Sequence, residues 1–235
     1  MKTSMKVISL DVWGTLLDTD IFFNKIAEEL SSITNRRKGE ILKGIQESYR
    51  KMKYLRREGM LNDNNIVEEC LEILSTDLKI NDEHIRNSVV KVILHHDLHD
   101  LVKVNALKTI AKLHNYGFKL VTLGNVVYWP GAYNRIILEI LGFSRYIELQ
   151  MYADEIKCSK PRKCAFLKLC EKLRVKPENV VHVGDDIYDD FIGALQAGLK
   201  AILIEPSFER VYKLKEVAYI IPSIREILDI ILTNK

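Results

Sequence analysis

Two short apolar segments of this sequence are each followed by acidic residues. Asp11 comes directly after Lys6–Leu10. Asp185 follows Val180–Val183 after one glycine, and Asp190 lies five residues further on. Apolar runs of this length are typical of buried strands, and in parallel sheets ligands bind beyond the carboxyl ends of the strands. A carboxylate at such a strand end can attack phosphorus or carbon and form a covalent ester, so we expect Asp11 to be a nucleophile.

The charges around this nucleophile indicate a metal ion and a fixed cation. Asp185 and Asp190 would repel Asp11 if the fold brought the three carboxylates together unaided. A hard, oxygen-preferring cation removes that repulsion, and Mg²⁺ is the usual one. Lys160, at the start of an expected helix, supplies positive charge that would neutralise the nucleophile and the developing transition state. The backbone N–H groups of Trp13–Thr15, with glycine at Gly14, are expected to cradle an anion.

Hydrophobic periodicity divides the chain into a helical part and an alternating part. Between about Ile21 and His96 apolar residues recur every three to four positions, which is typical of amphipathic helices, and no strand is expected there. After about Asp97 apolar runs alternate with helical segments, which predicts a parallel sheet with helices on both faces. The predicted fold is α/β, with a Rossmann-like parallel sheet core (1–17 and 100–235) and an inserted all-helical domain (18–99). Strands are expected near 119–123, 146–149, 180–183, 201–204 and 218–221, and a helix near 189–197.

Four motifs of the chain resemble those of the haloacid dehalogenase superfamily, in the same order and structural context. They are Asp11–Thr15, Asn125 after a strand, Lys160-Pro161 and Gly184-Asp185 with Asp190. The resemblance implies that Asp11 and Lys160 are catalytic. It also implies that Mg²⁺ is held by Asp11, the Trp13 carbonyl, Asp185 and Asp190. The helical segment resembles the helical cap of one branch of the superfamily, which closes over the site and chooses the substrate.

Two residues depart from the pattern of the family. Phosphatases of the superfamily carry a second Asp where Trp13 stands, to protonate the leaving group and then activate water, and an indole can do neither. Alkyl phosphates are therefore expected to react slowly, and aryl and acyl phosphates faster. The family places Ser or Thr where Gly124 stands, and Thr122 is a candidate replacement. Substrate contacts are expected from Trp13, Gly14, Thr122, Gly124 and Asn125.

Three functions remain open, and the acidic fourth motif favours the first. It is a Mg²⁺-dependent phosphatase of a small phosphorylated metabolite that acts through an aspartyl-phosphate intermediate. The second is a 2-haloacid dehalogenase, a branch that carries an aromatic Tyr at the Trp13 position but lacks the acidic pair. The third is a catalytically weak or inactive binding protein with the same fold, which Trp13 and Gly124 both allow.

Composition narrows the partners and the compartment. A net charge of +3 over 235 residues does not favour nucleic acid, and no apolar window is long enough for a membrane span. Met1–Lys6 lacks signal-peptide features, so a cytoplasmic protein with a small anionic substrate is expected. A homodimer is left open. The basic stretch Arg50–Arg57 is expected to be a solvated helix face, with an anion site as the alternative. The four cysteines form no CxxC pair, which predicts buried free thiols in a reducing compartment.

Overall fold

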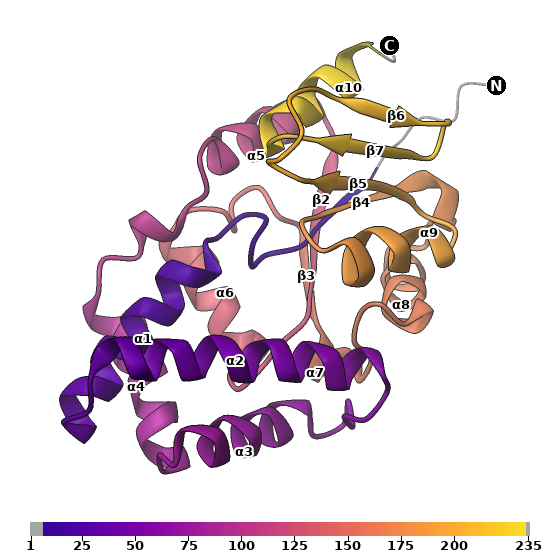
Figure 1. Ribbon diagram of the computed structural model, residues 1–235. Helices are drawn as coiled ribbons and strands as arrows, with labels where there is room; N and C mark the ends of the chain where they lie inside the picture. Colours follow the sequence, from indigo (N-terminus) through magenta and orange to yellow (C-terminus); the bar gives the residue numbers. More distant parts are fainter. Residues whose placement is uncertain (1–6, 234–235) are drawn as a thin grey trace.

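A single β-sheet brings distant segments of the chain side by side (Figure 1). The structure is a computed structural model that describes residues 7–233, so the predictions for Met1–Lys6 lie outside the described residues. The strands lie in the order β3-β2-β1-β4-β5-β7-β6, and all neighbours run parallel except β7 and β6. They span Val7–Leu10 (β1), Lys119–Gly124 (β2), Leu149–Tyr152 (β3), Val180–Gly184 (β4), Lys200–Ile204 (β5), Tyr212–Leu214 (β6) and Ala218–Ile221 (β7). The predicted Rossmann-like parallel core is confirmed.

The central strands β1 and β4 are buried throughout and mostly apolar, because helices cover both faces of the sheet. Alternate residues of β1 face opposite ways: Val7 packs in one cluster with Phe166, and Ile8 packs in another with Ile110. Helices α8 and α9 contribute to the first cluster, and α5 and α10 to the second. The core helices are α5 (Ala106–Asn115), α6 (Gly131–Ile140), α7 (Ala153–Ile156), α8 (Lys163–Leu173), α9 (Gly193–Gln196) and α10 (Ile227–Thr233), with 3₁₀ turns at His99–Leu101, Pro177–Asn179 and Ile224–Glu226.

Four α-helices lie between β1 and α5 in the sequence, below the sheet edge in Figure 1. They are α1 (Thr19–Thr34), α2 (Lys38–Arg57), α3 (Ile66–Leu78) and α4 (Asp82–His95). Asp18 caps α1, because its side chain accepts from the N–H groups of Asp20 and Ile21. The prediction of a helical segment without strands is confirmed for the described residues. Leu17 and Val102 form an antiparallel bridge where the chain leaves and re-enters the core. No helix within residues 7–233 is both long and apolar enough to cross a bilayer.

Three elements of the core differ from what the sequence predicts. The strand expected near 146–149 is β3, at Leu149–Tyr152, because Val121 of β2 pairs with Leu149 and the residues before it form turns. The expected helix near 189–197 is a π-helical segment, Ile187–Ile192, followed by the short α9. The edge strand β6 was not predicted, since its three residues are exposed and show no apolar alternation.

The cysteine prediction is wrong for two of the four thiols. Cys158 and Cys164 form a disulfide, with their Cα atoms 6.1 Å apart, whereas Cys70 and Cys170 are free and buried as predicted. A spacing of six residues carries no disulfide signal, but the turn before α8 brings the two residues together. The disulfide also removes the thiol-based argument for a reducing compartment.

Replacing both residues, Cys158→Ser with Cys164→Ser, is expected to lower the free energy of unfolding by about 2 kcal/mol. The physical reason is that the disulfide closes a short loop and so restricts the unfolded chain. Thermal unfolding measured with and without dithiothreitol checks this. Reduced wild type should have the same melting temperature as the double variant, and dithiothreitol should not change the melting temperature of the variant. Finding four reactive thiols in unreduced, denatured wild type would contradict the prediction.

Candidate active site

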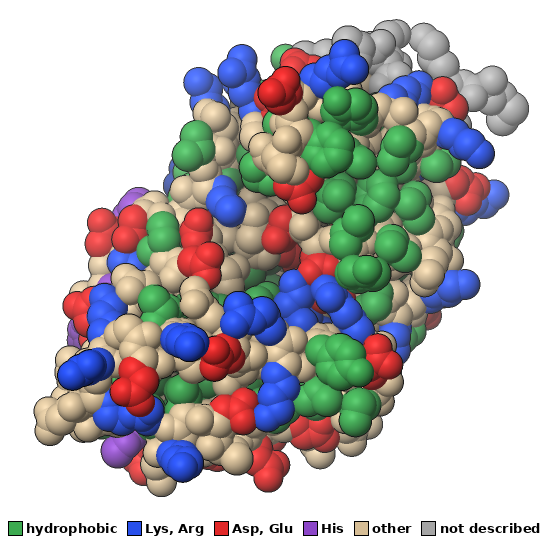
Figure 2. Space-filling view, in the orientation of Figure 1, with side chains coloured by type: hydrophobic (Ala, Val, Ile, Leu, Met, Phe, Trp, Pro, Cys, Tyr) green, Lys and Arg blue, Asp and Glu red, His purple; other side chains and the backbone are tan. Residues whose placement is uncertain are grey.

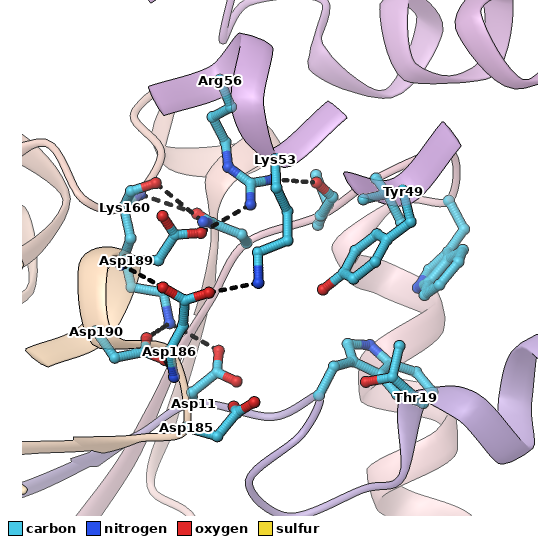
Figure 3. Close-up of a pocket in the computed structure, with 15 residues that line it drawn as sticks. Asp11, Thr19, Tyr49, Lys53, Arg56, Lys160, Asp185, Asp186, Asp189 and Asp190 are labelled. Carbon is cyan, nitrogen blue, oxygen red and sulfur yellow. Dashed lines mark hydrogen bonds and ion pairs between the residues drawn. The ribbon is translucent and has the colours of Figure 1, made fainter. Parts of the chain in front are cut away.

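Three neighbouring strands deliver the polar residues of the site to one edge of the sheet. β1 lies between β2 and β4, and Leu10 is in register with both Thr122 and Val183. Asp11, Asn125 and Asp185 therefore follow three adjacent strand ends, which is where ligands bind in such sheets. The pocket there encloses about 530 Å³ of space free of protein atoms, with some of it open to solvent. Asp11 lies at its base (Figure 3).

The three predicted carboxylates lie together, with one oxygen of each of Asp11, Asp185 and Asp190 within 4.8 Å of the others. Asp11 is only 8% exposed and Asp190 only 2%. Burial raises the pKa of Asp11 to about 8, and the charges of Asp190 and Asp185 add to the rise although Lys160 opposes it. Desolvation and the charge of Asp190 raise the pKa of Asp185 to about 6. Three carboxylates therefore crowd together, two of them with raised pKa values, and a bound cation would offset their mutual repulsion.

Lys160 joins two of these carboxylates. Its Nζ donates to Asp11 Oδ1 at 2.7 Å and to Asp190 Oδ1 at 2.6 Å, and the residue is 2% exposed. Although burial favours the neutral amine, the two carboxylates hold the pKa of Lys160 above its usual value. Burial alone would raise the pKa of Asp190, but Lys160 and His182 hold it well below its usual range. Lys160 lies in the loop before α8 rather than at the helix start, since the helix begins at Lys163.

Asn125 holds the Lys160 loop through the backbone. Its Nδ2 donates to the Lys160 carbonyl at 3.0 Å, and its Oδ1 accepts from the Lys160 N–H at 2.9 Å. Both polar ends of the amide therefore contact Lys160, although Asn125 also lines the pocket. The motif predicted to contact substrate positions the lysine in this structure.

The loop after Asp11 encloses the acidic cluster tightly. Gly14 has φ 90°, and a Cβ there would lie 2.2 Å from Asp185 Oδ2, so only glycine fits. Thr15 Oγ1 donates to Asp185 Oδ1 at 3.1 Å. The N–H of Gly14 donates to the carbonyl of Leu17 at 2.7 Å. That N–H is consequently used within the loop, which contradicts its predicted part in an anion cradle.

Trp13 is fixed in a group of aromatic rings between the core and the helical segment. Its ring lies 4.7 Å from Phe22 and 5.6 Å from Trp129, measured between centroids. The indole N–H groups of Trp13 and Trp129 both donate to Asn134 Oδ1, at 3.0 and 2.9 Å. Trp13 lines the pocket, but its one polar hydrogen is bound to α6 and points to no reacting group.

A tyrosine ring occupies the space where the family carries a serine or threonine side chain. A Cβ on Gly124 would lie 3.1 Å from the ring of Tyr152, so the ring and a larger residue compete for this space. Thr122 is fully buried, and neither Thr122 nor Gly124 is among the described residues that line the pocket. The structure therefore gives no support to Thr122 as a replacement hydroxyl.

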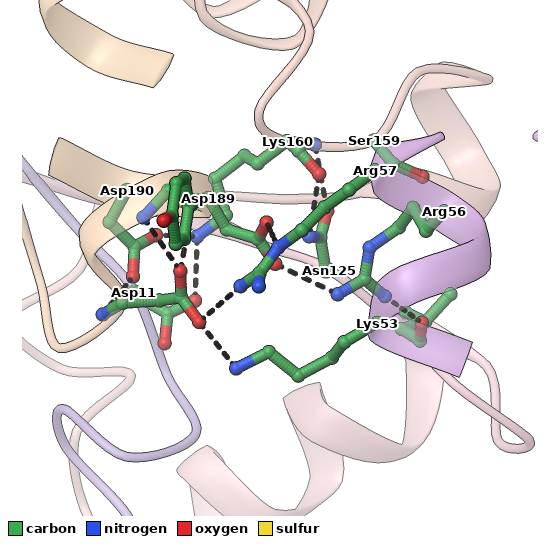
Figure 4. Close-up of polar contacts among 12 residues, drawn as sticks. Asp11, Lys53, Arg56, Arg57, Asn125, Ser159, Lys160, Asp189 and Asp190 are labelled. Atoms are coloured by element: carbon green, nitrogen blue, oxygen red, sulfur yellow. Dashed lines mark hydrogen bonds and ion pairs between the residues drawn. The ribbon is translucent and has the colours of Figure 1, made fainter. Parts of the chain in front are cut away.

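Helix α2 covers the other side of the pocket with basic residues (Figure 4). Lys53 and Arg57 both pair with Asp186, the latter at 2.6 Å. Arg57 and Arg56 pair with Asp189, at 2.7 and 2.9 Å. Figure 2 shows basic side chains over the C-terminal end of α2 against acidic ones of the core. The prediction of a solvated face is wrong for these three cations, because the core loop after β4 carries matching carboxylates.

A second contact joins the helical segment to the Lys160 loop. Asp63, which is 6% exposed, accepts hydrogen bonds from the N–H and the hydroxyl of Ser159, at 2.7 and 2.6 Å. It also pairs with Arg162. Sequence reasoning missed Asp63 and Asn134, because each lies in a segment without a motif and meets the site only through tertiary structure.

Comparison with known proteins decides the family. Residues 5–198 match the family model of the haloacid dehalogenase-like hydrolases. The chain belongs to this family. The resemblance noted in the sequence is thereby confirmed, together with the hydrolase class of the family.

Several curated relatives within the superfamily are phosphatases. A glyceraldehyde 3-phosphate phosphatase from Methanopyrus kandleri is 32% identical over 102 residues, which is 43% of this chain and 42% of the relative. A ribulose-1,5-bisphosphate 5-phosphatase from Halopiger xanaduensis is 35% identical over 72 residues, 31% of this chain and 30% of the relative. The matched segments thus span less than half of these relatives.

Solved structures of haloacid dehalogenase-like hydrolases share the whole fold. YfnB from Bacillus subtilis, a hydrolase of this superfamily bound to magnesium, has a TM-score of 0.77 at 18% identity, over 97% of this chain and 99% of that one. The L-2-haloacid dehalogenase from Xanthobacter autotrophicus has a TM-score of 0.72 at 14% identity, over 97% and 98% of the two chains. At these identities the likeness establishes the fold alone.

Proposed function

We propose that this hydrolase is a Mg²⁺-dependent phosphatase of a small phosphorylated metabolite, with Asp11 as its nucleophile. The observation that carries the proposal is the contact of Lys160 with Asp11 inside a cluster of three carboxylates. The phosphatase activities of the curated relatives support it, although each match covers less than half of the relative. The helical segment 18–99 would act as the cap, and 1–17 with 100–235 as the core.

The residues at the strand ends fit a hard divalent cation. Three carboxylates crowd together and the Lys160 ammonium bonds to two of them, so oxygen ligands and negative charge are both in excess. Asp11, Asp185 and the Trp13 carbonyl would hold the ion, with Asp190 beside them. When bound, Mg²⁺ supplies positive charge that offsets the carboxylates and the phosphoryl oxygens.

The chain's own residues then define the chemistry. An oxygen of Asp11 attacks phosphorus, the bond from phosphorus to the leaving oxygen breaks, and an aspartyl phosphate results. Lys160 keeps Asp11 oriented and offsets negative charge as it develops. Asn125 and Asp63 hold the loop that carries Lys160, so both would act on the reaction by positioning that lysine. Water finally cleaves the aspartyl phosphate and restores Asp11.

Dehalogenation is the second candidate, and the aromatic Trp13 at the pocket favours it. The acidic cluster opposes it, because an added carboxylate pair repels the carboxylate of a haloacid. A panel of aryl, alkyl and acyl phosphates and 2-haloacids, each with Mg²⁺ and with EDTA, separates the readings. The proposal requires phosphate release that depends on Mg²⁺. Halide release that persists in EDTA would show that the protein is a dehalogenase. No turnover of any of these substrates would favour the binding protein without catalytic activity.

Asp185→Ala is expected to weaken Mg²⁺ binding by at least roughly tenfold, since it removes one anionic ligand from an otherwise intact cluster. Titration calorimetry measures the affinity directly. Mg²⁺ should also raise the melting temperature of wild type and have little effect on the variant, because a ligand stabilises only the state that binds it. Asp82→Ala, at an exposed acid of α4, is the control. Equal Mg²⁺ affinity in wild type and Asp185→Ala would contradict the predicted ligand set.

The remaining predictions concern the cell and the assembly. A small anionic substrate fits a pocket lined by Lys53, Arg56 and Lys160. Cytoplasmic location, the lack of a nucleic-acid partner and a homodimer stay predictions from the sequence.

A further inference from the structure

The proposed phosphatase lacks a proton donor at the position where its family carries one. When an alkyl phosphate reacts with Asp11, the leaving oxygen departs as an alkoxide and needs a proton. Trp13 cannot provide it, because the indole N–H is a weak acid that is bound to Asn134. Another group of the pocket must therefore do so if alkyl esters are substrates, and the inference below rests on the proposed function.

Most acidic groups around the pocket are committed to other partners. Asp186 and Asp189 each accept from two cations of α2. Lys160 lies between Asp11 and Asp190, and its ammonium already donates to both carboxylates.

Lys53 has both the position and the chemistry that the reaction needs. It lies on α2 and lines the same pocket as Asp11, with its ammonium pointing toward the space above that residue (Figure 3). Asp186 holds the Nζ through an ion pair, so the side chain does not swing freely. An alkylammonium group can give a proton to a departing alkoxide, because it is a far stronger acid than an alcohol.

We propose that Lys53 is the acid and base of the reaction, in place of the residue that Trp13 replaces. As the bond from phosphorus to the ester oxygen breaks, the Lys53 ammonium gives one proton to that oxygen, and an alcohol leaves. The amine that remains takes a proton from the water that attacks phosphorus in phospho-Asp11. The bond from phosphorus to the Asp11 oxygen breaks, inorganic phosphate leaves, and Lys53 is an ammonium again. Protons balance over the cycle without another reactant.

Tyr49 is the competing donor on the same helix. Its ring lies 5.6 Å from Lys53 Nζ, and its hydroxyl belongs to a residue that also lines the pocket. Burial raises the pKa of Tyr49, so its hydroxyl is a weaker acid than a free phenol. Tyr49→Phe therefore belongs in the test as the rival variant.

The sharpest variant is Lys53→Arg, which keeps the charge and can keep the pair with Asp186. A guanidinium does not release its proton, so the variant retains binding charge and loses only proton transfer. Lys53→Met removes both functions. Lys51→Met is the matched control, since Lys51 pairs with Asp77 within the cap and does not line the pocket.

The test compares glycerol phosphate with 4-nitrophenyl phosphate at saturating Mg²⁺. For Lys53→Arg we expect kcat/KM to fall roughly 10²–10⁴-fold with glycerol phosphate and less than roughly tenfold with the aryl ester, whose phenolate leaves unprotonated. With the aryl ester kcat should still fall and a burst of nitrophenolate should appear, because no base activates the water that hydrolyses phospho-Asp11. The preference for aryl over alkyl phosphates, which Trp13 led us to expect for wild type, should then appear in Lys53→Arg instead, because wild type has Lys53 as a proton donor.

A rescue experiment tests the same role. Methylamine should restore part of the glycerol phosphate activity of Lys53→Ala, because it can occupy the space of the missing ammonium.

The outcomes separate the two levels of the proposal. Equal losses with both esters, or full activity of Lys53→Arg, would overturn the role of Lys53 and leave the phosphatase standing. The same would follow if Tyr49→Phe showed the selective loss and Lys53→Arg did not. If wild type released phosphate from neither ester, the proposed function would fall and this inference with it. A melting temperature of Lys53→Arg near that of wild type and Lys51→Met is expected.

Discussion

Asp11→Asn is expected to lower phosphatase activity by at least about 10⁴-fold while the fold stays intact. The amide cannot form the acyl phosphate, and loss of a nucleophile alone can remove most of an enzyme's rate enhancement. The substitution keeps the shape of the side chain, and the amide oxygen can still accept from Lys160. Phosphate release from an aryl phosphate and the thermal unfolding curve are the two measurements.

The difference in stability between wild type and this variant depends on pH, and its sign follows from the burial of Asp11 in wild type. Burial raises its pKa to about 8 in the folded chain, compared with about 3.9 in an unfolded one. Its contribution to stability is therefore present below pH 4 and is lost as the pH rises through about 8. Asn does not titrate, so in EDTA the variant should be at least as stable as wild type at pH 8. Retained activity would exclude Asp11 as nucleophile, and an unfolded variant would contradict the stability argument.

The fold was predictable where local pattern and burial agree. β1 and β4 are buried and mostly apolar because helices cover both faces of the sheet, and the buried residues of α1 to α4 recur with the 3.6-residue period seen in the sequence. β6 could not be predicted, since Tyr212–Leu214 is exposed and pairs only because the chain turns back at Lys215, with φ 57°. β3 begins later than predicted because Tyr146, which the sequence pattern assigned to the strand, packs instead against His114 of α5.

The residues of the site were likewise predictable only where a local sequence signal marks them. Residues placed by strand ends were found from the sequence, because a buried strand followed by an acid is a local signal. Lys53 meets Asp186 across 133 residues, Asp63 meets Ser159 across 96, and Asn134 meets Trp13 across 121. No local pattern encodes such contacts. A basic helix face looks solvated until the carboxylates opposite to it are known, which is why Lys53, Arg56 and Arg57 were misjudged.

Lys160→Met is expected to abolish activity and also to destabilise the protein by about 3–5 kcal/mol at neutral pH. Methionine fills nearly the same volume, so the loss is electrostatic. Lys160 is 2% exposed and bonds two carboxylates, and removing one member of a buried ion pair leaves charge that neither water nor protein compensates. Lys163→Met, at an exposed lysine at the start of α8, should change stability by less than about 0.5 kcal/mol. Urea unfolding in EDTA measures both.

The pH dependence of the Lys160→Met effect distinguishes lost charge compensation from lost packing. In wild type Lys160 helps to hold the pKa of Asp190 below its unfolded value, so Asp190 stabilises the protein above about pH 4. In the variant the pKa values of Asp11 and Asp190 should both rise, and the folded state should bind protons more tightly than the unfolded one. The destabilisation should then shrink as the pH falls toward 4, where both carboxyls are protonated. Adding Asp190→Asn to Lys160→Met should recover a large part of the lost stability, because one uncompensated charge disappears. A loss that is constant with pH and unaffected by Asp190→Asn would show that Lys160 contributes by packing alone.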